Sequence, residues 1–173
     1  LPPAELSWKR PRYGFAGFWF LSLVGAWFLL RLVLLLAFKP AGLPAADVLL
    51  AFLSGLHRDL WAGLVETIPL LFWMLIVPDR AFGARWHRML FLFSCFVFWY
   101  VQVFLLFVEF FFFDEFRSRF NTVAVDYLLY PREVFINIWE SYHVGVILVI
   151  CLVLSLGWLF AASRLFQQMW ERP

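Results

Sequence analysis

Charged and polar side chains gather between two long apolar stretches of the chain, in residues 116–142, and five of them are candidates to contact a lipid headgroup or to dock another domain. These candidates are Arg117, Arg119, Asn121, Asp126 and Glu133. Arginine forms charge-assisted hydrogen bonds with phosphate oxygens and with carboxylates. The two arginines therefore have alternative partners, either an anionic lipid headgroup or the neighbouring Asp114 and Glu115 in a solvated charge cluster. In the first case the five residues form a face for lipid headgroups or for docking of another domain.

A second set of polar residues lies inside the apolar stretches themselves. It comprises Arg31, Asp59, Glu66, Gln102 and Glu109. Asp59 and Glu66 are seven residues apart, so they share one helix face. The same spacing aligns Gln102 and Glu109 with Cys95, and such a stripe should face protein rather than lipid. We expect these residues to form a polar network that holds helices together or binds a lipid headgroup.

The remaining reactive residues do not form a recognisable site. Cys95 and Cys151 each lie inside an apolar stretch without a CxxC partner, which is typical of small buried hydrophobes. The three histidines are scattered, so no metal-ligand spacing is present and no cofactor is expected in this chain. The basic residues are spread along the chain rather than gathered in one patch, which argues against nucleic acid as a partner.

Composition identifies the solvent of the chain as a lipid bilayer. Of its 173 residues, 64% are hydrophobic and only 15% are charged, and they include 23 phenylalanines and 10 tryptophans. A water-soluble fold of this length has too little interior to bury so much aromatic surface. The sequence therefore predicts an all-α membrane protein with four transmembrane helices plus interfacial amphipathic helices.

Four apolar stretches are long enough to cross a hydrocarbon core of about 30 Å. They predict spans at about 15–38, 60–77, 89–113 and 144–162, within a single transmembrane domain that covers residues 1–173. Interfacial helices are expected at about 45–56 and 131–142, the second beginning at Pro131.

Two points inside these spans allow more than one interpretation. Residues 47–77 form either one long tilted helix or two helices, and the polar triplet at 57–59 favours two. Arg31 lies two turns before the end of the first span, which favours a side chain that reaches back to the interface. The alternatives for Arg31 are a buried ion pair and a contact with a lipid phosphate.

Basic residues predict the direction in which the chain crosses the membrane. One side has eight of them: Lys9, Arg10, Arg12, Arg80, Arg85, Arg88, Arg164 and Arg172. The other side has four: Lys39, Arg117, Arg119 and Arg132. The side with eight is expected to be cytoplasmic, so the N-terminus lies inside and residues 116–142 face outward.

The segment 120–142, FNTVAVDYLLYPREVFINIWESY, resembles a pattern found in the membrane domains of the lipoteichoic acid synthase-like family of phosphoglycerol transferases. In that pattern F-N-x-x-A-V-D-Y-L-x-Y precedes E-V and then N-I-x-E-S-Y. The matching residues are Phe120, Asn121, Ala124, Val125, Asp126, Tyr127, Leu128, Tyr130, Glu133, Val134, Asn137, Ile138, Glu140, Ser141 and Tyr142. Residues 55–60 also resemble the G-L-x-x-D-L stretch of the family, and the two matches cover about a fifth of the chain.

This resemblance implies a function for the parent protein. Members of the family have five membrane helices followed by an extracytoplasmic catalytic domain of the alkaline phosphatase/sulfatase fold. That domain uses a threonine nucleophile and a divalent metal, manganese or magnesium, to move glycerol phosphate from phosphatidylglycerol to an acceptor. Thr67 and Thr122 do not match its motif. The chain is thus expected to be the non-catalytic membrane part of a phosphoglycerol- or phosphoethanolamine-type transferase of the bacterial inner membrane. The catalytic domain is absent from it, and its expected partners are that domain and membrane lipids, above all phosphatidylglycerol.

Two other functions are compatible with the residues alone. A non-catalytic assembly subunit would use the aromatic surface to pack on a partner protein. A small transporter would use Asp59, Glu66, Gln102 and Glu109 as an ion path, although the sequence has no inverted repeat.

Overall fold

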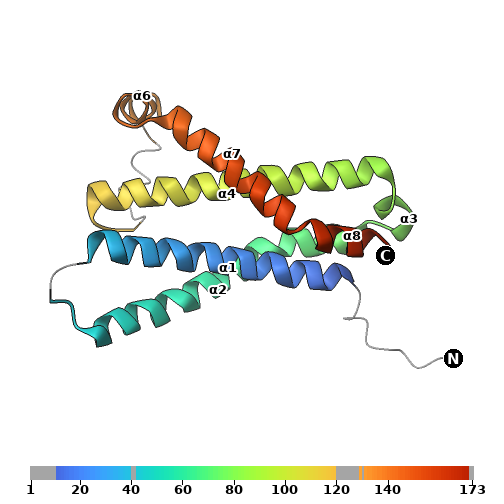
Figure 1. The fold of residues 1–173 in the computed structure, drawn as a ribbon, viewed down its shortest axis with the longest axis horizontal. Helices are drawn as coiled ribbons and strands as arrows, with labels where there is room; N and C mark the ends of the chain where they lie inside the picture. The colour runs from blue at the N-terminus through green and yellow to red at the C-terminus, as the bar shows by residue number, and fades with distance from the viewer. Residues whose placement is uncertain (1–10, 40–41, 120–128, 130, 172–173) are drawn as a thin grey trace. The chain divides into compact units, whose positions relative to one another are not determined.

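The computed structural model describes residues 11–39, 42–119, 129 and 131–171, and within these ranges the chain forms helices and no strands (Figure 1). The helices are α1 (Pro11–Phe38), α2 (Ala45–Ile76), α3 (Asp79–Phe82), α4 (Arg85–Phe116), α6 (Pro131–Ser141), α7 (Val144–Ala161) and α8 (Ser163–Glu171).

Four of the helices in the described part of the chain, α1, α2, α4 and α7, are long and apolar enough to cross a membrane. Large apolar side chains on them lie on the surface: Leu36, Leu75 and Phe160 are 76%, 75% and 83% exposed. Extended apolar surfaces of this kind are unfavourable in water and favourable in lipid. The prediction of an all-α, multi-pass membrane protein is confirmed.

The predicted break after residue 56 is wrong. Helix α2 runs without interruption from Ala45 to Ile76, through the polar triplet and through Pro69. The charge of Asp59 does not require a break in the helix, because this side chain is buried against Arg31 of α1. His57 and Arg58 are exposed. A helix of 32 residues is about 48 Å long, so it must tilt in the membrane or extend beyond the hydrocarbon.

The chain divides into two compact units. The first comprises residues up to 93 and from 161 onward, and so contains α1, α2, α3, the first turns of α4, and α8. The second comprises residues 94–160, and so contains the rest of α4 together with α6 and most of α7.

Aromatic rings fill the core of the first unit. The ring of Phe15 on α1 lies 5.7 Å from that of Phe91 on α4 and 4.9 Å from that of Phe166 on α8, measured between centroids. Phe166 also stacks on Trp170, and with Met169 it is buried. The sequence analysis did not predict α8, although Phe166, Met169 and Trp170 recur at the three- and four-residue steps of an amphipathic helix.

His87 connects three elements at the turn between α2 and α4. Its side chain is 1% exposed, its Nε2 lies 2.9 Å from Trp73 Nε1, and its Nδ1 lies 3.2 Å from the carbonyl oxygen of Phe82. An indole nitrogen can only donate and a carbonyl can only accept. His87 is therefore the neutral tautomer that carries its proton on Nδ1, and it has a structural role here rather than that of a metal ligand.

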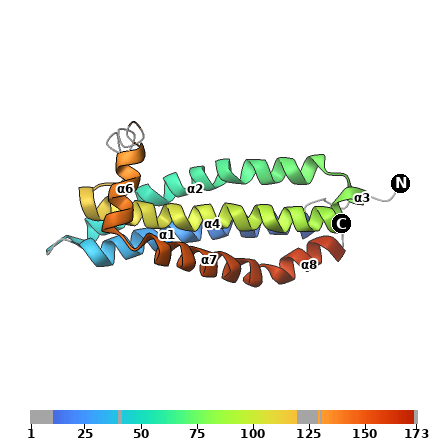
Figure 2. The same cartoon turned by 90° about the horizontal axis from the view of Figure 1, so that it is seen from above.

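In the second unit, α4 and α7 pack through stacked indoles, with the rings of Trp99 and Trp158 4.5 Å apart. Cys95, Gln102 and Glu109 are all buried, which confirms that their stripe does not face lipid. Helix α6 agrees with the helix predicted at 131–142, and Figure 2 shows it standing across the direction of α7. This orientation suits a helix that rests at a membrane surface.

Candidate functional site

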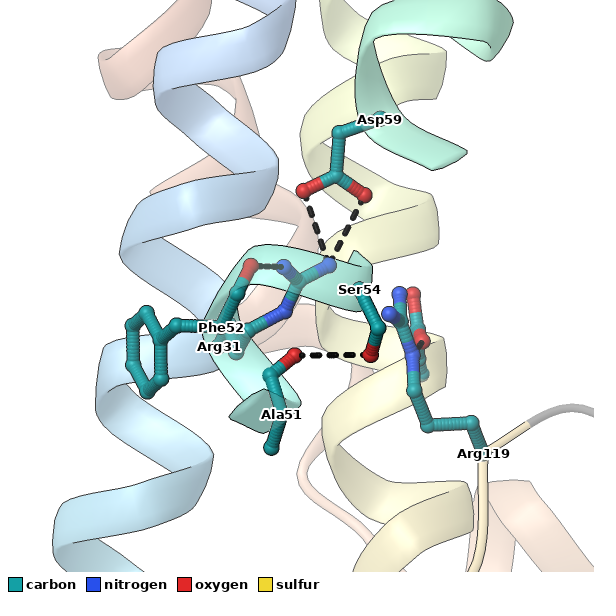
Figure 3. A network of polar contacts seen from close by, with 7 residues as sticks. Arg31, Ala51, Phe52, Ser54, Asp59 and Arg119 are labelled. Carbon is teal, nitrogen blue, oxygen red and sulfur yellow. Dashed lines mark hydrogen bonds and ion pairs between the residues drawn. The ribbon is translucent and has the colours of Figure 1, made fainter. Parts of the chain in front are cut away.

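Arg31 of α1 reaches across to α2 and forms an ion pair with Asp59. Its Nη2 lies 2.9 and 2.8 Å from the two carboxylate oxygens of Asp59, and its Nη1 donates to the carbonyl of Phe52 at 3.2 Å (Figure 3). The two charged side chains are only 12% and 6% exposed. The favoured interpretation, that Arg31 reaches back to the interface, is therefore wrong, and the alternative of a buried ion pair is what the structure has.

Gly55 makes room for this arginine. A Cβ atom at position 55 would overlap the guanidinium of Arg31, which lies directly on the α2 backbone. Phe52, Gly55 and Asp59 are spaced by three and four residues, so they share one helix face. We call Arg31, Gly55 and Asp59 the α1–α2 clasp.

The clasp explains how charged groups are accommodated within two apolar helices. Each charge would be costly alone in a low-dielectric environment, but here the carboxylate neutralises the guanidinium and the Phe52 carbonyl accepts a further hydrogen bond. Loss of one partner leaves the other charge buried and unpaired. The clasp thus joins α1 to α2 at a defined register.

The five polar residues predicted inside the spans do not form a single network. Arg31 and Asp59 form one pair, whereas Glu109, on α4, pairs with Arg119. Oε2 of Glu66 is buried without a hydrogen-bond partner among the described residues, and Gln102 is buried in the second unit. Of the three carboxylates in this set, Asp59 and Glu109 are therefore neutralised by arginines, and Glu66 is not paired with one among the described residues.

The chain reverses sharply at the end of α4. Arg117 follows the last helical residue with a left-handed backbone, φ 52°, and its N–H donates to the carbonyl of Phe113 at 2.8 Å. This geometry is a helix C-terminal cap that usually has glycine. It brings Arg119 back along α4 to the buried carboxylate of Glu109, a partner three turns upstream that the sequence analysis did not consider.

The other residues of the predicted headgroup face are less constrained. Arg117 lies 3.7 Å from Asp114, and both side chains are exposed, as expected for a weak solvated pair. Glu133 is exposed in the first turn of α6. Asn121 and Asp126 lie outside the described residues.

Replacing Arg117 with glycine should stabilise the protein by about 1 kcal/mol, because the left-handed conformation costs an L-residue about that much and glycine almost nothing. The measurement is thermal unfolding in detergent micelles. Arg117→Ala is the matched control, since it removes the same charge and keeps the Cβ. An equal gain from alanine would mean that the charge, rather than the backbone, is the cause.

No group of three histidine, cysteine, aspartate or glutamate side chains that could hold a metal ion occurs among the described residues. The chain matches no protein-family model, no curated protein and no solved structure. The resemblance to phosphoglycerol transferases therefore rests on the residues of 55–60 and 120–142 quoted above.

Proposed function

We propose that this chain is the membrane domain of a phosphoglycerol transferase, which anchors a catalytic domain outside the membrane and helps to present phosphatidylglycerol to it. The observation that carries the proposal is the residue pattern of 120–142, which begins directly after Arg119 and continues through α6. The four membrane-spanning helices supply the anchor.

The reaction proposed for the parent protein breaks the phosphate–diacylglycerol bond of phosphatidylglycerol and joins the phosphoglycerol group to an acceptor hydroxyl, releasing diacylglycerol. The threonine nucleophile and the divalent metal, manganese or magnesium, would belong to the catalytic domain. The role of this chain would be to hold the anionic headgroup at the membrane surface, where arginine is well suited to phosphate.

The end of α4 is where this binding would occur. Arg119 is 45% exposed even though it pairs with Glu109, so one edge of its guanidinium is fixed to α4 while the side chain stays accessible. Arg117 is exposed two residues before it. We assign Arg117, Arg119, Asn121, Asp126 and Glu133 to a lipid-entry face, with Glu133 contributed by the first turn of α6.

The pairing of the carboxylates favours an anchor over a transporter. An ion path needs carboxylates that can exchange partners with a passing cation, whereas Asp59 and Glu109 each have a guanidinium counter-ion. A non-catalytic assembly subunit remains the alternative. From the distribution of basic residues we propose that the N-terminus lies in the cytoplasm. From the family resemblance we propose that the membrane is a bacterial inner membrane.

Arg119→Ala should lower the release of diacylglycerol from labelled phosphatidylglycerol by about tenfold or more, since a charge-assisted hydrogen bond contributes about 1.5–3 kcal/mol. The assay uses membranes that contain the whole protein at equal expression. Arg132→Ala is the control, because Arg132 is also an exposed arginine of this segment but is not part of the proposed face.

The two parts of the proposal fail in different ways. Wild-type activity of Arg119→Ala would refute the lipid-entry face and leave the transferase intact. A lack of diacylglycerol release by the wild-type protein, with manganese or magnesium supplied, would refute the transferase and favour the assembly subunit.

A further inference from the structure

An apolar groove lies between α1 and α2, within the first unit. It has a volume of about 470 Å³, and every side chain that lines it is apolar; they include Phe28, Leu35, Val48, Leu49, Phe52 and Leu56. Figure 1 shows the two helices separating toward the C-terminal end of α1 and the N-terminal end of α2. None of its lining residues belongs to the lipid-entry face, and the site does not depend on the proposed function.

The inner end of the groove is closed by fixed contacts. The rings of Phe28 and Phe52 meet edge to face, with centroids 5.4 Å apart. The carbonyl of Phe52 accepts a hydrogen bond from Arg31, whose guanidinium lies 6.0 Å from the Phe52 ring centroid. The α1–α2 clasp therefore holds this wall of the groove in place.

The chemistry of the groove restricts what can fill it. Water would lack the two to four polar partners that it needs. A peptide strand or loop would leave backbone N–H and C=O groups without partners at membrane depth. A helix about 10 Å wide would fill this volume with roughly one turn. A hydrocarbon chain is narrow and has no hydrogen-bonding groups to satisfy.

A charged residue at the mouth identifies the class of hydrocarbon ligand. Lys39 lies one turn after Leu35, a lining residue, and its backbone N–H donates to the carbonyl of Leu35 at 2.9 Å, so Lys39 stands one turn beyond the α1 side of the lining. Its side chain is exposed, and an ammonium group in this position attracts a phosphate. We propose that the groove binds one acyl chain of a membrane phospholipid, with the lipid phosphate beside Lys39.

The test uses the whole chain in lipid nanodiscs with a small fraction of phosphatidylcholine that has a diazirine in one acyl chain. After illumination, mass spectrometry locates the cross-links. We expect residues 48–56 of α2 to be labelled at least fivefold more than Val153 and Leu156, which are exposed residues of α7. Equal labelling of the two regions would mean ordinary annular lipid and would overturn the proposal.

Two substitutions on α2 distinguish labelling by lipid in the groove from labelling by lipid on the outer surface of the helix. Val48→Trp fills the groove and should lower labelling of 48–56 at least threefold. Leu50→Trp is the matched control: Leu50 is 67% exposed and is not among the lining residues, so labelling should not change. An unchanged yield in Val48→Trp would overturn the proposal.

If Val48→Trp does not fold, Lys39→Glu tests the proposal instead, because Lys39 is an exposed side chain outside the lining of the groove. It should lower labelling of 48–56 at least threefold and leave labelling of α7 unchanged. Retention of wild-type labelling in Lys39→Glu would overturn the assignment of the phosphate to Lys39.

Discussion

Asp59→Ala should lower the free energy of unfolding by about 3–5 kcal/mol, the cost typical of leaving one member of a buried ion pair without its partner. The guanidinium of Arg31 would remain against the α2 backbone, where it is 12% exposed and where the Phe52 carbonyl is the one acceptor left to it among the described residues. Thermal unfolding in detergent micelles, followed by circular dichroism, measures the loss.

Two further variants separate the charge effect from a general effect of substitution. Asp114→Ala removes a carboxylate whose pair with Arg117 is exposed and 3.7 Å long, so it should cost less than about 1 kcal/mol. The double variant Arg31→Met/Asp59→Leu removes both charges and should recover most of the lost stability. A small effect of Asp59→Ala alone would contradict the clasp.

Gly55→Ala should lower the free energy of unfolding by about 1–3 kcal/mol, although alanine is the better helix former, because the added methyl group disturbs a buried charge-assisted hydrogen bond. The added methyl group occupies the position of the Arg31 guanidinium, so the guanidinium must shift and its bonds with Asp59 are weakened. The same unfolding measurement applies.

The matched control for this prediction is Gly25→Ala in α1. A Cβ at position 25 meets nothing within 4 Å, so alanine there should be neutral or stabilise the helix by up to about 1 kcal/mol. In an Arg31→Ala background, Gly55→Ala should lose its cost, because the two positions are coupled through direct contact. A Gly55→Ala variant as stable as the wild type would show that Arg31 does not lie on the α2 backbone.

The sequence predicted the membrane-spanning helices well because hydrophobic length is a local property of the chain. The spans at 15–38, 89–113 and 144–162 lie within or closely follow α1, α4 and α7. The break predicted at 57–59 is wrong because it depends on a contact that is not local in the sequence. A polar triplet suggests an exit from lipid only if its charge is unpaired, and the partner of Asp59 is Arg31, 28 residues earlier on another helix.

The candidate sites also divide into a local part that the sequence predicts and a non-local part that it does not. The sequence identified Arg31, Asp59, Glu109 and Arg119 as the residues to consider, since charges near or inside membrane spans are rare. It could not pair them, because pairing depends on how the helices pack and on the left-handed turn at Arg117. Gly55 was quoted only as part of a motif, and its role emerges from the arginine that lies against it.

The α1–α2 clasp also bears on how the protein enters the membrane during synthesis. A charged residue inside a single apolar helix raises the cost of insertion, by about 2.5–3.5 kcal/mol when it lies at the helix centre and by less toward the helix end. Arg31 and Asp59 lie on consecutive helices, so a nascent hairpin of α1 and α2 can leave the translocon with these two charges already neutralised. The clasp therefore favours release of α1 and α2 into lipid as one unit, after both have been made.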